Sequence, residues 1–289
     1  MNLPLPWPFE REFMQLALVA GVVVGATAPL MGVFLVQRRM SLMGDGIGHV
    51  AFAGVAGGVL LDIWPIWSAL VVSVAGALTI ELLRSRGTAG GDLALAVFFY
   101  GGIAGGVVMV GLADSLDGSI LSYLFGSILT VTAGDVWVVV VLGAVVAAAI
   151  LVAARALFAM AVDEEWSRVA GLPVGLLNGA LAVLVALTIV AAMRVVGILL
   201  VAALMVLPVA SGQLLARSQV AILGWSVVIG MSAAVTGLAA ARVWGLAPGG
   251  TIVLVTVVVF AVVAVGAAIV GARRRHLATG LFPIDSHSH

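Results

Sequence analysis

Residues 136–158 read VWVVVVLGAVVAAAILVAARALF, 23 consecutive positions with one charged side chain, Arg155. A helix that crosses the hydrocarbon core of a membrane needs about 20 mainly apolar residues. Eight further stretches meet this requirement: Phe13–Val36, Gly44–Leu61, Ile66–Leu83, Leu93–Leu112, Val174–Met193, Val195–Leu215, Val220–Ala241 and Thr251–Gly271. The sequence therefore predicts an all-α, polytopic integral membrane protein with about nine transmembrane helices. Because only Arg194 separates two of these stretches, one of the two could be a partial or broken span.

The composition excludes a water-soluble fold and several classes of function. Of the 289 residues, 63% are hydrophobic and only 9% are charged, whereas soluble domains carry about 25% charged residues. The formal net charge is zero, which gives no indication of a nucleic-acid partner. Cysteine is absent, so a metal ligand must come from His, Asp, Glu, Met or backbone oxygen. The sequence contains no GxxxxGK[ST] motif, so the chain does not bind ATP by that route.

The placement of arginine predicts the orientation in the membrane. Cytoplasmic loops carry an excess of basic residues. With the loop after the first span placed in the cytoplasm, ten arginines lie inside and three lie outside. The three outer ones are Arg11, Arg194 and Arg242. We therefore expect the N-terminus outside and the C-terminus in the cytoplasm.

We expect residues 1–289 to form a single transmembrane domain, with three segments outside the spans. Residues 1–12 carry prolines and aromatic rings and are expected at the membrane interface. Residues 159–173 form a long inner connection, and residues 272–289 a cytoplasmic tail. In the outer connection 113–134, residues 120–129 are apolar but too short to span, which predicts a half-helix that dips into the membrane.

Asp45 and His49 are the candidate metal ligands. Their spacing of four places both side chains on one face of a helix, one turn apart. A carboxylate oxygen and an imidazole nitrogen suit zinc or manganese, and ionisable groups at the start of a span are costly and usually functional. Two alternatives stay open: Asp45 as a helix cap, and His49 as a buried neutral imidazole.

Other polar residues give weaker indications. The spacing of Glu81 and Arg84 predicts an ion pair within one helix. Asp92 and Asp135 stand just before spans and are interpreted as helix caps. The remaining polar candidates either line a pathway or hold helices together by hydrogen bonds; they are Asn178, Ser211 and Gln213. The tail carries His287 and His289, which could collect metal loosely or be incidental.

Four stretches resemble the permeases of bacterial zinc and manganese ABC importers. They are RMSLMGDGIGH at 39–49, EWSRVAGLPV at 165–174, VVGILLVAAL at 195–204 running on to Pro208, and PGGT at 248–251. Their order and spacing agree with that family over nearly the whole chain. The sequence is therefore identified as a member of the metal-chelate permease family.

The resemblance implies a four-subunit importer in the bacterial cytoplasmic membrane. It would contain two copies of this chain and two ATPase subunits, and an extracytoplasmic binding protein would deliver the metal. The chain itself would be no enzyme and hold no cofactor, because ATP is bound and hydrolysed by the partner. Asp45 and His49 would line the path of transported Zn²⁺ or Mn²⁺.

The resemblance also implies an ATPase-docking segment and a preferred metal. The docking, or coupling, residues would be Glu164, Glu165, Trp166, Arg168 and Gly171. The run from Val50 to Gly54 favours zinc, because manganese members tend to carry a proline before that last glycine. The alternative function is a secondary cation transporter or channel that works alone, which would not need the long inner connection.

Overall fold

A computed structural model describes residues 7–86, 91–113 and 118–280 of the chain. These residues form helices joined by short connections. In chain order they are α1 (Glu12–Gln37), α2 (Met43–Leu60), α3 (Pro65–Ser85), α4 (Gly91–Leu112), α5 (Gly118–Phe125), α6 (Ala133–Val162), α7 (Glu164–Val169), α8 (Val174–Ala192), α9 (Ile198–Leu215), α10 (Gln219–Trp244) and α11 (Pro248–Gly280).

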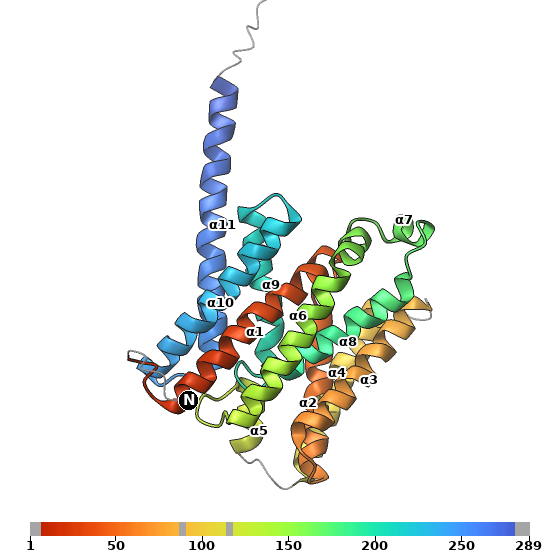
Figure 1. Ribbon diagram of the computed structural model, residues 1–289, viewed down its shortest axis with the longest axis vertical. Helices are drawn as coiled ribbons and strands as arrows, with labels where there is room; N and C mark the ends of the chain where they lie inside the picture. The colour runs from red at the N-terminus through yellow and green to blue at the C-terminus, as the bar shows by residue number, and fades with distance from the viewer. Residues whose placement is uncertain (1–6, 87–90, 114–117, 281–289) are drawn as a thin grey trace, which may run out of the picture.

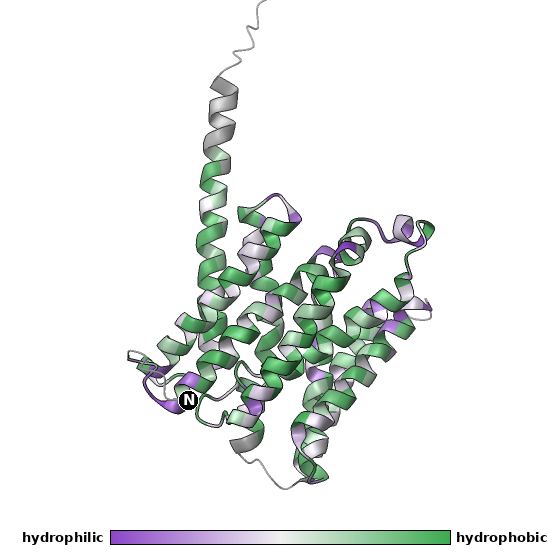
Figure 2. Cartoon of the chain, in the orientation of Figure 1, coloured by the Kyte–Doolittle hydropathy of each residue, from purple (hydrophilic) through white to green (hydrophobic). Residues whose placement is uncertain are grey.

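Within the described residues, nine helices are long and apolar enough to cross a membrane, so the predicted fold class is confirmed. Figure 2 shows apolar residues along the middle of the bundle and polar residues gathered towards its two ends. The helices extend beyond the predicted apolar stretches at several ends. The fifth span, for example, runs from Ala133 to Val162, because hydropathy marks the membrane-embedded part and not the end of the helix.

Helix α1 forms the centre of the bundle. It packs against α6, α8, α9 and α10 (Figure 1), and its side chains from Met14 to Leu35 are largely buried. Close approach to α10 depends on glycine, because a Cβ on Gly25 would lie 2.7 Å from the carbonyl oxygen of Gly230. By contrast, α4 and α11 stand at the periphery with mostly exposed apolar side chains. Lipid or a partner must cover those surfaces.

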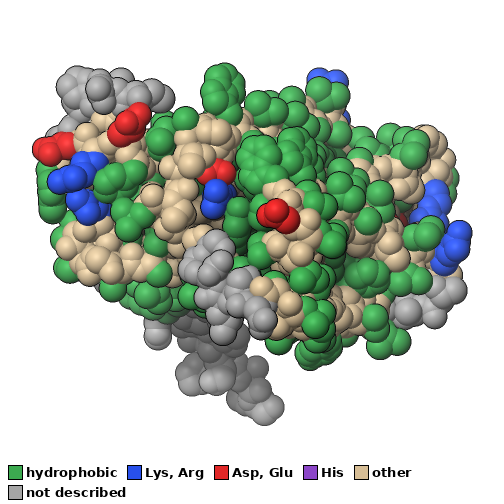
Figure 3. Space-filling model, turned by 90° about the horizontal axis from the view of Figure 1, so that it is seen from below, with side chains coloured by type: hydrophobic (Ala, Val, Ile, Leu, Met, Phe, Trp, Pro, Cys, Tyr) green, Lys and Arg blue, Asp and Glu red, His purple; other side chains and the backbone are tan. Residues whose placement is uncertain are grey.

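Figure 1 places α7 and the C-terminal part of α11 at one end of the bundle, and α5 and the start of α1 at the other. Seen from this second end, the surface shows many apolar side chains, with charged side chains at several places and acidic and basic ones side by side at some of them (Figure 3). We expect the α7 end to face the cytoplasm, from the distribution of arginine. Part of the predicted tail is helical, since α11 runs to Gly280; His287 and His289 lie outside the described residues.

The α8–α9 break separates two complete spans, which decides the question left open by the sequence. Residues 193–197 leave the helical path between Ala192 and Ile198, and Gly197 has a φ of 89°. A Cβ there would lie 2.4 Å from the Leu124 carbonyl oxygen of α5. Glycine is therefore required both for the backbone conformation and for the close approach.

The predicted half-helix is shorter than expected. Helix α5 ends at Phe125, and the chain leaves the helical path before Thr132 begins α6. Asp135 is not the cap itself: Thr132 is the N-cap, and Asp135 completes a capping box as the third helical residue. Asp135 also accepts a hydrogen bond from Nε of Arg194 at 3.0 Å, so it ties the start of α6 to the α8–α9 break.

Candidate functional site

A tight turn positions the candidate metal ligands at the start of α2. Arg39 adopts a left-handed conformation with a φ of 57°, and the Met40 N–H then donates to the Leu35 carbonyl at 2.8 Å. Helix α2 begins at Met43, so Asp45 lies in its first turn. The chain therefore reverses at once after α1, and the ligand-bearing turn lies beside the end of that helix.

Glycines bury one face of α2 and leave Asp45 and His49 on its flank. A Cβ on Gly44 would lie 3.3 Å from the Ala202 methyl group, and a Cβ on Gly48 would lie 3.3 Å from the Ile198 carbonyl oxygen. Both contacts are with α9, so α2 and α9 pack closely along these small residues. Asp45 and His49 are half-buried.

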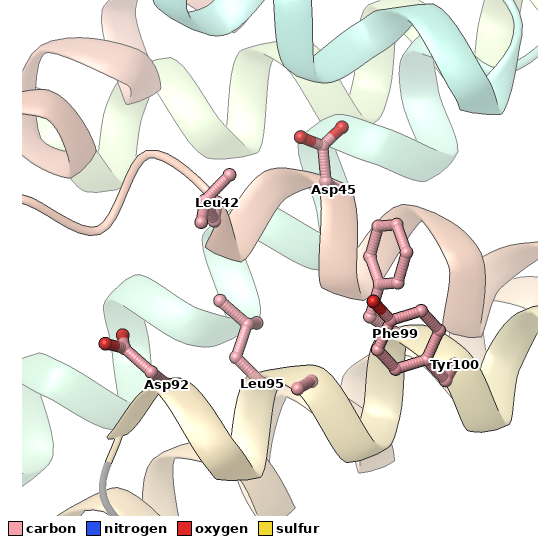
Figure 4. Close-up of a pocket in the computed structure, with 7 residues that line it drawn as sticks. Leu42, Asp45, Asp92, Leu95, Phe99 and Tyr100 are labelled. Carbon is pink, nitrogen blue, oxygen red and sulfur yellow. The ribbon is translucent and has the colours of Figure 1, made fainter.

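A groove of about 250 Å³ between α2 and α4 contains Asp45. Figure 4 shows Asp45 on α2, and Asp92, Leu95 and the Phe99 ring on α4, with Phe99 standing towards α2. The complete lining is Leu42, Asp45, Asp92, Leu95, Ala96, Phe99 and Tyr100. The groove is mainly apolar with two carboxylates, so it offers an ion very few polar partners other than Asp45 and Asp92.

His49 has an unsatisfied nitrogen. Its ring meets the edge of Phe99 with centroids 4.3 Å apart, and its Nδ1 is buried with no hydrogen-bond partner among the described residues. A buried polar atom without a partner costs about 1–3 kcal/mol and calls for an explanation. A histidine with a purely structural role would normally satisfy that nitrogen, so the observation favours a ligand role.

The described part of the chain contains no group of three or more His, Asp or Glu side chains that could hold a metal. Asp45 and His49 therefore form at most part of a coordination shell. A closed zinc site usually has four ligands. Further ligands must come from water, from backbone oxygen or from another copy of the chain.

A second groove continues from the first towards the end of α1. It has a volume of about 400 Å³ and shares Leu42, Asp92 and Leu95 with the groove of Asp45. Its other lining residues include Arg38, Arg39, Ser41 and Arg84. The two grooves together lead from Asp45 to the end of the bundle that we expect in the cytoplasm.

Sequence reasoning missed several of these lining residues. Asp92 belongs to the first turn of α4 and also lines both grooves, which its interpretation as a cap did not anticipate. Nothing in the sequence indicated that Phe99 and Tyr100 line a groove, since both belong to an apolar stretch. Their positions on α4, three and four residues after Ala96, would have identified them only if α4 had been known to face α2.

The three residues predicted to line a pathway or to hold helices together are not among the lining residues of either groove. Asn178 of α8 accepts a hydrogen bond from Arg38 at 2.5 Å. Ser211 is fully buried and donates to the Leu207 carbonyl within its own helix. Gln213 is exposed. None of the three lines the groove of Asp45.

Helix α7 contains the predicted coupling residues except Gly171, which follows it, and projects from the end of the bundle (Figure 1). Asp163 caps it by accepting from the Trp166 N–H at 2.8 Å, and Ser167 faces the interior. Trp166 and Val169 are 70% and 84% exposed. Glu165, Arg168 and Gly171 are also exposed. A short helix with outward-facing apolar side chains at a polar end of the protein is suited to docking.

Comparison with known proteins gives consistent matches over most of the chain. Residues 10–267 match the ABC 3 transport family. The chain is 32% identical to the manganese import system permease protein ScaB of Streptococcus parasanguinis, with 87% of this chain and 89% of the relative covered. It is 28% identical to the high-affinity zinc uptake system membrane protein ZnuB of Haemophilus influenzae, with 86% and 95% covered.

A solved structure of PsaBC from Streptococcus pneumoniae in complex with Fab has the same fold. The TM-score is 0.80 at 31% sequence identity, and the match covers 88% of this chain and 91% of that one. The likeness therefore extends from the motifs to the arrangement of nearly all helices.

Proposed function

The chain belongs to the ABC 3 transport family, and from this we propose that it is the membrane-spanning permease of an ATP-driven importer of Zn²⁺, or alternatively Mn²⁺. The observation that carries the proposal is the Asp45–His49 pair on α2: Asp45 lines the α2–α4 groove, and His49 Nδ1 is buried with no hydrogen-bond partner among the described residues. Oxygen and nitrogen ligands suit both metals. Zinc is the first choice because the run from Val50 to Gly54 resembles the zinc members of the family more than the manganese members.

The incomplete ligand set supports a symmetric pair of permeases. A two-fold axis beside the first turns of two α2 helices would bring together two Asp45 and two His49. Four such ligands match the number that zinc usually takes. The other arrangement is one partial site in each copy, completed by water. Either version suits transport, because an importer must release the ion that it binds.

Direct comparison of the two metals tests this function. We expect the permease, reconstituted in liposomes with its ATPase subunits and its extracytoplasmic metal-binding protein, to hydrolyse ATP faster with Zn²⁺ than with Mn²⁺. Stronger stimulation by Mn²⁺ would reassign the cargo. The proposal would be contradicted if the rate of ATP hydrolysis were the same with either metal as without metal and neither metal were taken up. That result would favour a different substrate.

The exposed face of α7 favours the importer over a transporter that works alone. Such a carrier has no evident use for Trp166 and Val169 on a projecting helix in water. We propose that these two side chains, with Glu165 and Arg168, contact the ATPase. Gly171 follows α7 with a φ of 85°, so a bulky residue there would strain the turn that presents the helix.

Removing both apolar side chains of α7 is expected to weaken ATPase binding. Buried aromatic anchors at an interface often contribute more than 1 kcal/mol, and 1.4 kcal/mol is a factor of ten. The variant Trp166→Ala/Val169→Ala should therefore lower the affinity for the ATPase about tenfold or more, measured by co-purification at a series of concentrations.

The matched control for α7 is Trp244→Ala. Trp244 is also 70% exposed but ends α10 at the opposite end of the bundle. Its loss should leave ATPase binding unchanged. Undiminished binding by the α7 variant would mean that the ATPase docks elsewhere.

A further inference from the structure

Arg38 is a buried charge at the junction of three helices. It is the residue that ends α1, and its side chain is only 5% exposed. Its guanidinium donates one hydrogen bond to Asn178 Oδ1 at 2.5 Å and another to the Glu164 carboxylate. Burying a guanidinium is costly unless it is paired. Here the two hydrogen bonds pair it, and they link α1, α7 and α8 at this point.

Glu164 is the anchor of α7 in this cluster. Besides Arg38, its carboxylate accepts from Asn178 Nδ2 at 3.4 Å and pairs with the exposed Arg168 at 3.5 Å. Helix α7 has only six residues and packs against its chain neighbours α6 and α8. Through Arg38 it is also bonded to α1, which is 126 residues away in sequence.

A short segment with successive backbone hydrogen bonds leads from Arg38 to the candidate metal ligands. The Arg38 N–H donates to the Phe34 carbonyl, and the Met40 N–H donates to the Leu35 carbonyl. The Met43 N–H then donates to the Met40 carbonyl at 2.9 Å. The turn is therefore held by successive backbone hydrogen bonds, and a displacement of Arg38 would be passed to the first turn of α2.

We propose that Arg38 is a positioning residue that couples α7 to α2, so that movement of the ATPase-docking helix changes the surroundings of Asp45 and His49. The inference rests on the proposed function, because it takes α7 as the ATPase contact. The coupling depends on two charge-assisted hydrogen bonds from one guanidinium, which bonds Glu164 of α7 and Asn178 of α8 at once. Arg38 also lines the groove that leads to Asp45.

The test measures metal delivered per ATP hydrolysed by the complete complex in liposomes, with Zn²⁺ as the probe. We expect Arg38→Gln to keep the ATPase bound and hydrolysing while the ratio of metal to ATP falls about tenfold, within the range of 5–150-fold typical of coupling between sites. Arg38→Lys keeps the positive charge but loses the guanidinium that bonds two partners at once, so the ratio of metal to ATP should fall less than in Arg38→Gln. The exchange Arg38→Glu/Glu164→Arg should restore part of it.

A second charged pair serves as the control. Arg84 Nε donates to Glu81 at 2.9 Å, but both residues belong to α3. Glu81→Gln should therefore leave the ratio unchanged. The same loss in Glu81→Gln would mean that any charge removed near this end uncouples transport.

Two outcomes would overturn the inference. One is an unchanged ratio in both Arg38→Gln and Arg38→Lys. The other is loss of uptake in exact step with loss of bound ATPase, which would make Arg38 a docking residue only. If the unaltered complex binds and hydrolyses ATP but takes up neither metal, the proposed function fails as well; if it transports and Arg38→Gln is unaffected, this inference alone fails.

Discussion

Replacing either Asp45 or His49 with alanine is expected to abolish metal uptake, with a loss of at least about 100-fold. Residues that merely support a metal ligand typically change affinity 10–100-fold when mutated, and the loss of a ligand itself should exceed that. Asp45 and His49 are the two candidate ligands that α2 carries, so one substitution removes half of this pair. Uptake of Zn²⁺ and Mn²⁺ by cells or liposomes measures the effect.

The same variants should still insert into the membrane and bind the ATPase, because neither side chain lies on the α9-facing side of α2, where Gly44 and Gly48 make the close contacts. Leu42→Ala is the matched control. Leu42 lines the same groove and is 65% exposed, yet it has no ligand atom, so uptake should fall much less. Transport of both metals at the unaltered rate by His49→Ala would make His49 a structural histidine and refute the site.

The spans could be predicted from the sequence because hydropathy is a local property. The apolar run at residues 136–158 predicts a membrane-spanning helix without any information about tertiary contacts. The ends of that helix depend on other chemistry, namely the Thr132 capping box and the cap residue Asp163. The sequence placed an interruption at Arg194, but the extension of the break to Gly197 could not be predicted, since it depends on close contact with α5.

Part of the candidate site could likewise be predicted from the sequence, and part could not. Asp45 and His49 could be recognised because their spacing places them on one helix face. The groove around them could not, because Asp92 and Phe99 come from α4 and meet α2 only in the folded bundle. Asn178 shows the limit most clearly. Its partner Arg38 is 140 residues distant, so the sequence left open whether Asn178 lines a pathway or holds helices together, and in the structure it belongs to a charged junction.

A second large effect is expected at the opposite end of the bundle, where Arg194 meets Asp135. The Asp135 side chain is 2% exposed and accepts from Arg194 Nε at 3.0 Å and from the Thr132 hydroxyl at 2.8 Å. The Arg194 guanidinium also lies 4.6 Å from the centre of the Tyr123 ring of α5. The cluster therefore joins α5, the start of α6 and the α8–α9 break.

Arg194→Met is expected to destabilise the protein by about 3–5 kcal/mol, because it leaves the buried Asp135 carboxylate uncompensated. In a thermal unfolding experiment in detergent, the midpoint should fall by roughly 10 °C. The double variant Arg194→Met/Asp135→Asn should recover much of that loss, since it removes the stranded charge and keeps an oxygen for the Thr132 hydroxyl.

The control for this pair is Arg242→Met. Arg242 is exposed, and its guanidinium lies 5.4 Å from the centre of the Phe13 ring, a contact that contributes about 0.5–1 kcal/mol at exposed sites. Its loss should lower the midpoint only slightly. If the double variant is as unstable as Arg194→Met, then Arg194 stabilises the α8–α9 break by packing on Tyr123, and charge neutralisation is not the cause. A recovered midpoint would instead show that the uncompensated Asp135 carboxylate causes the loss in Arg194→Met.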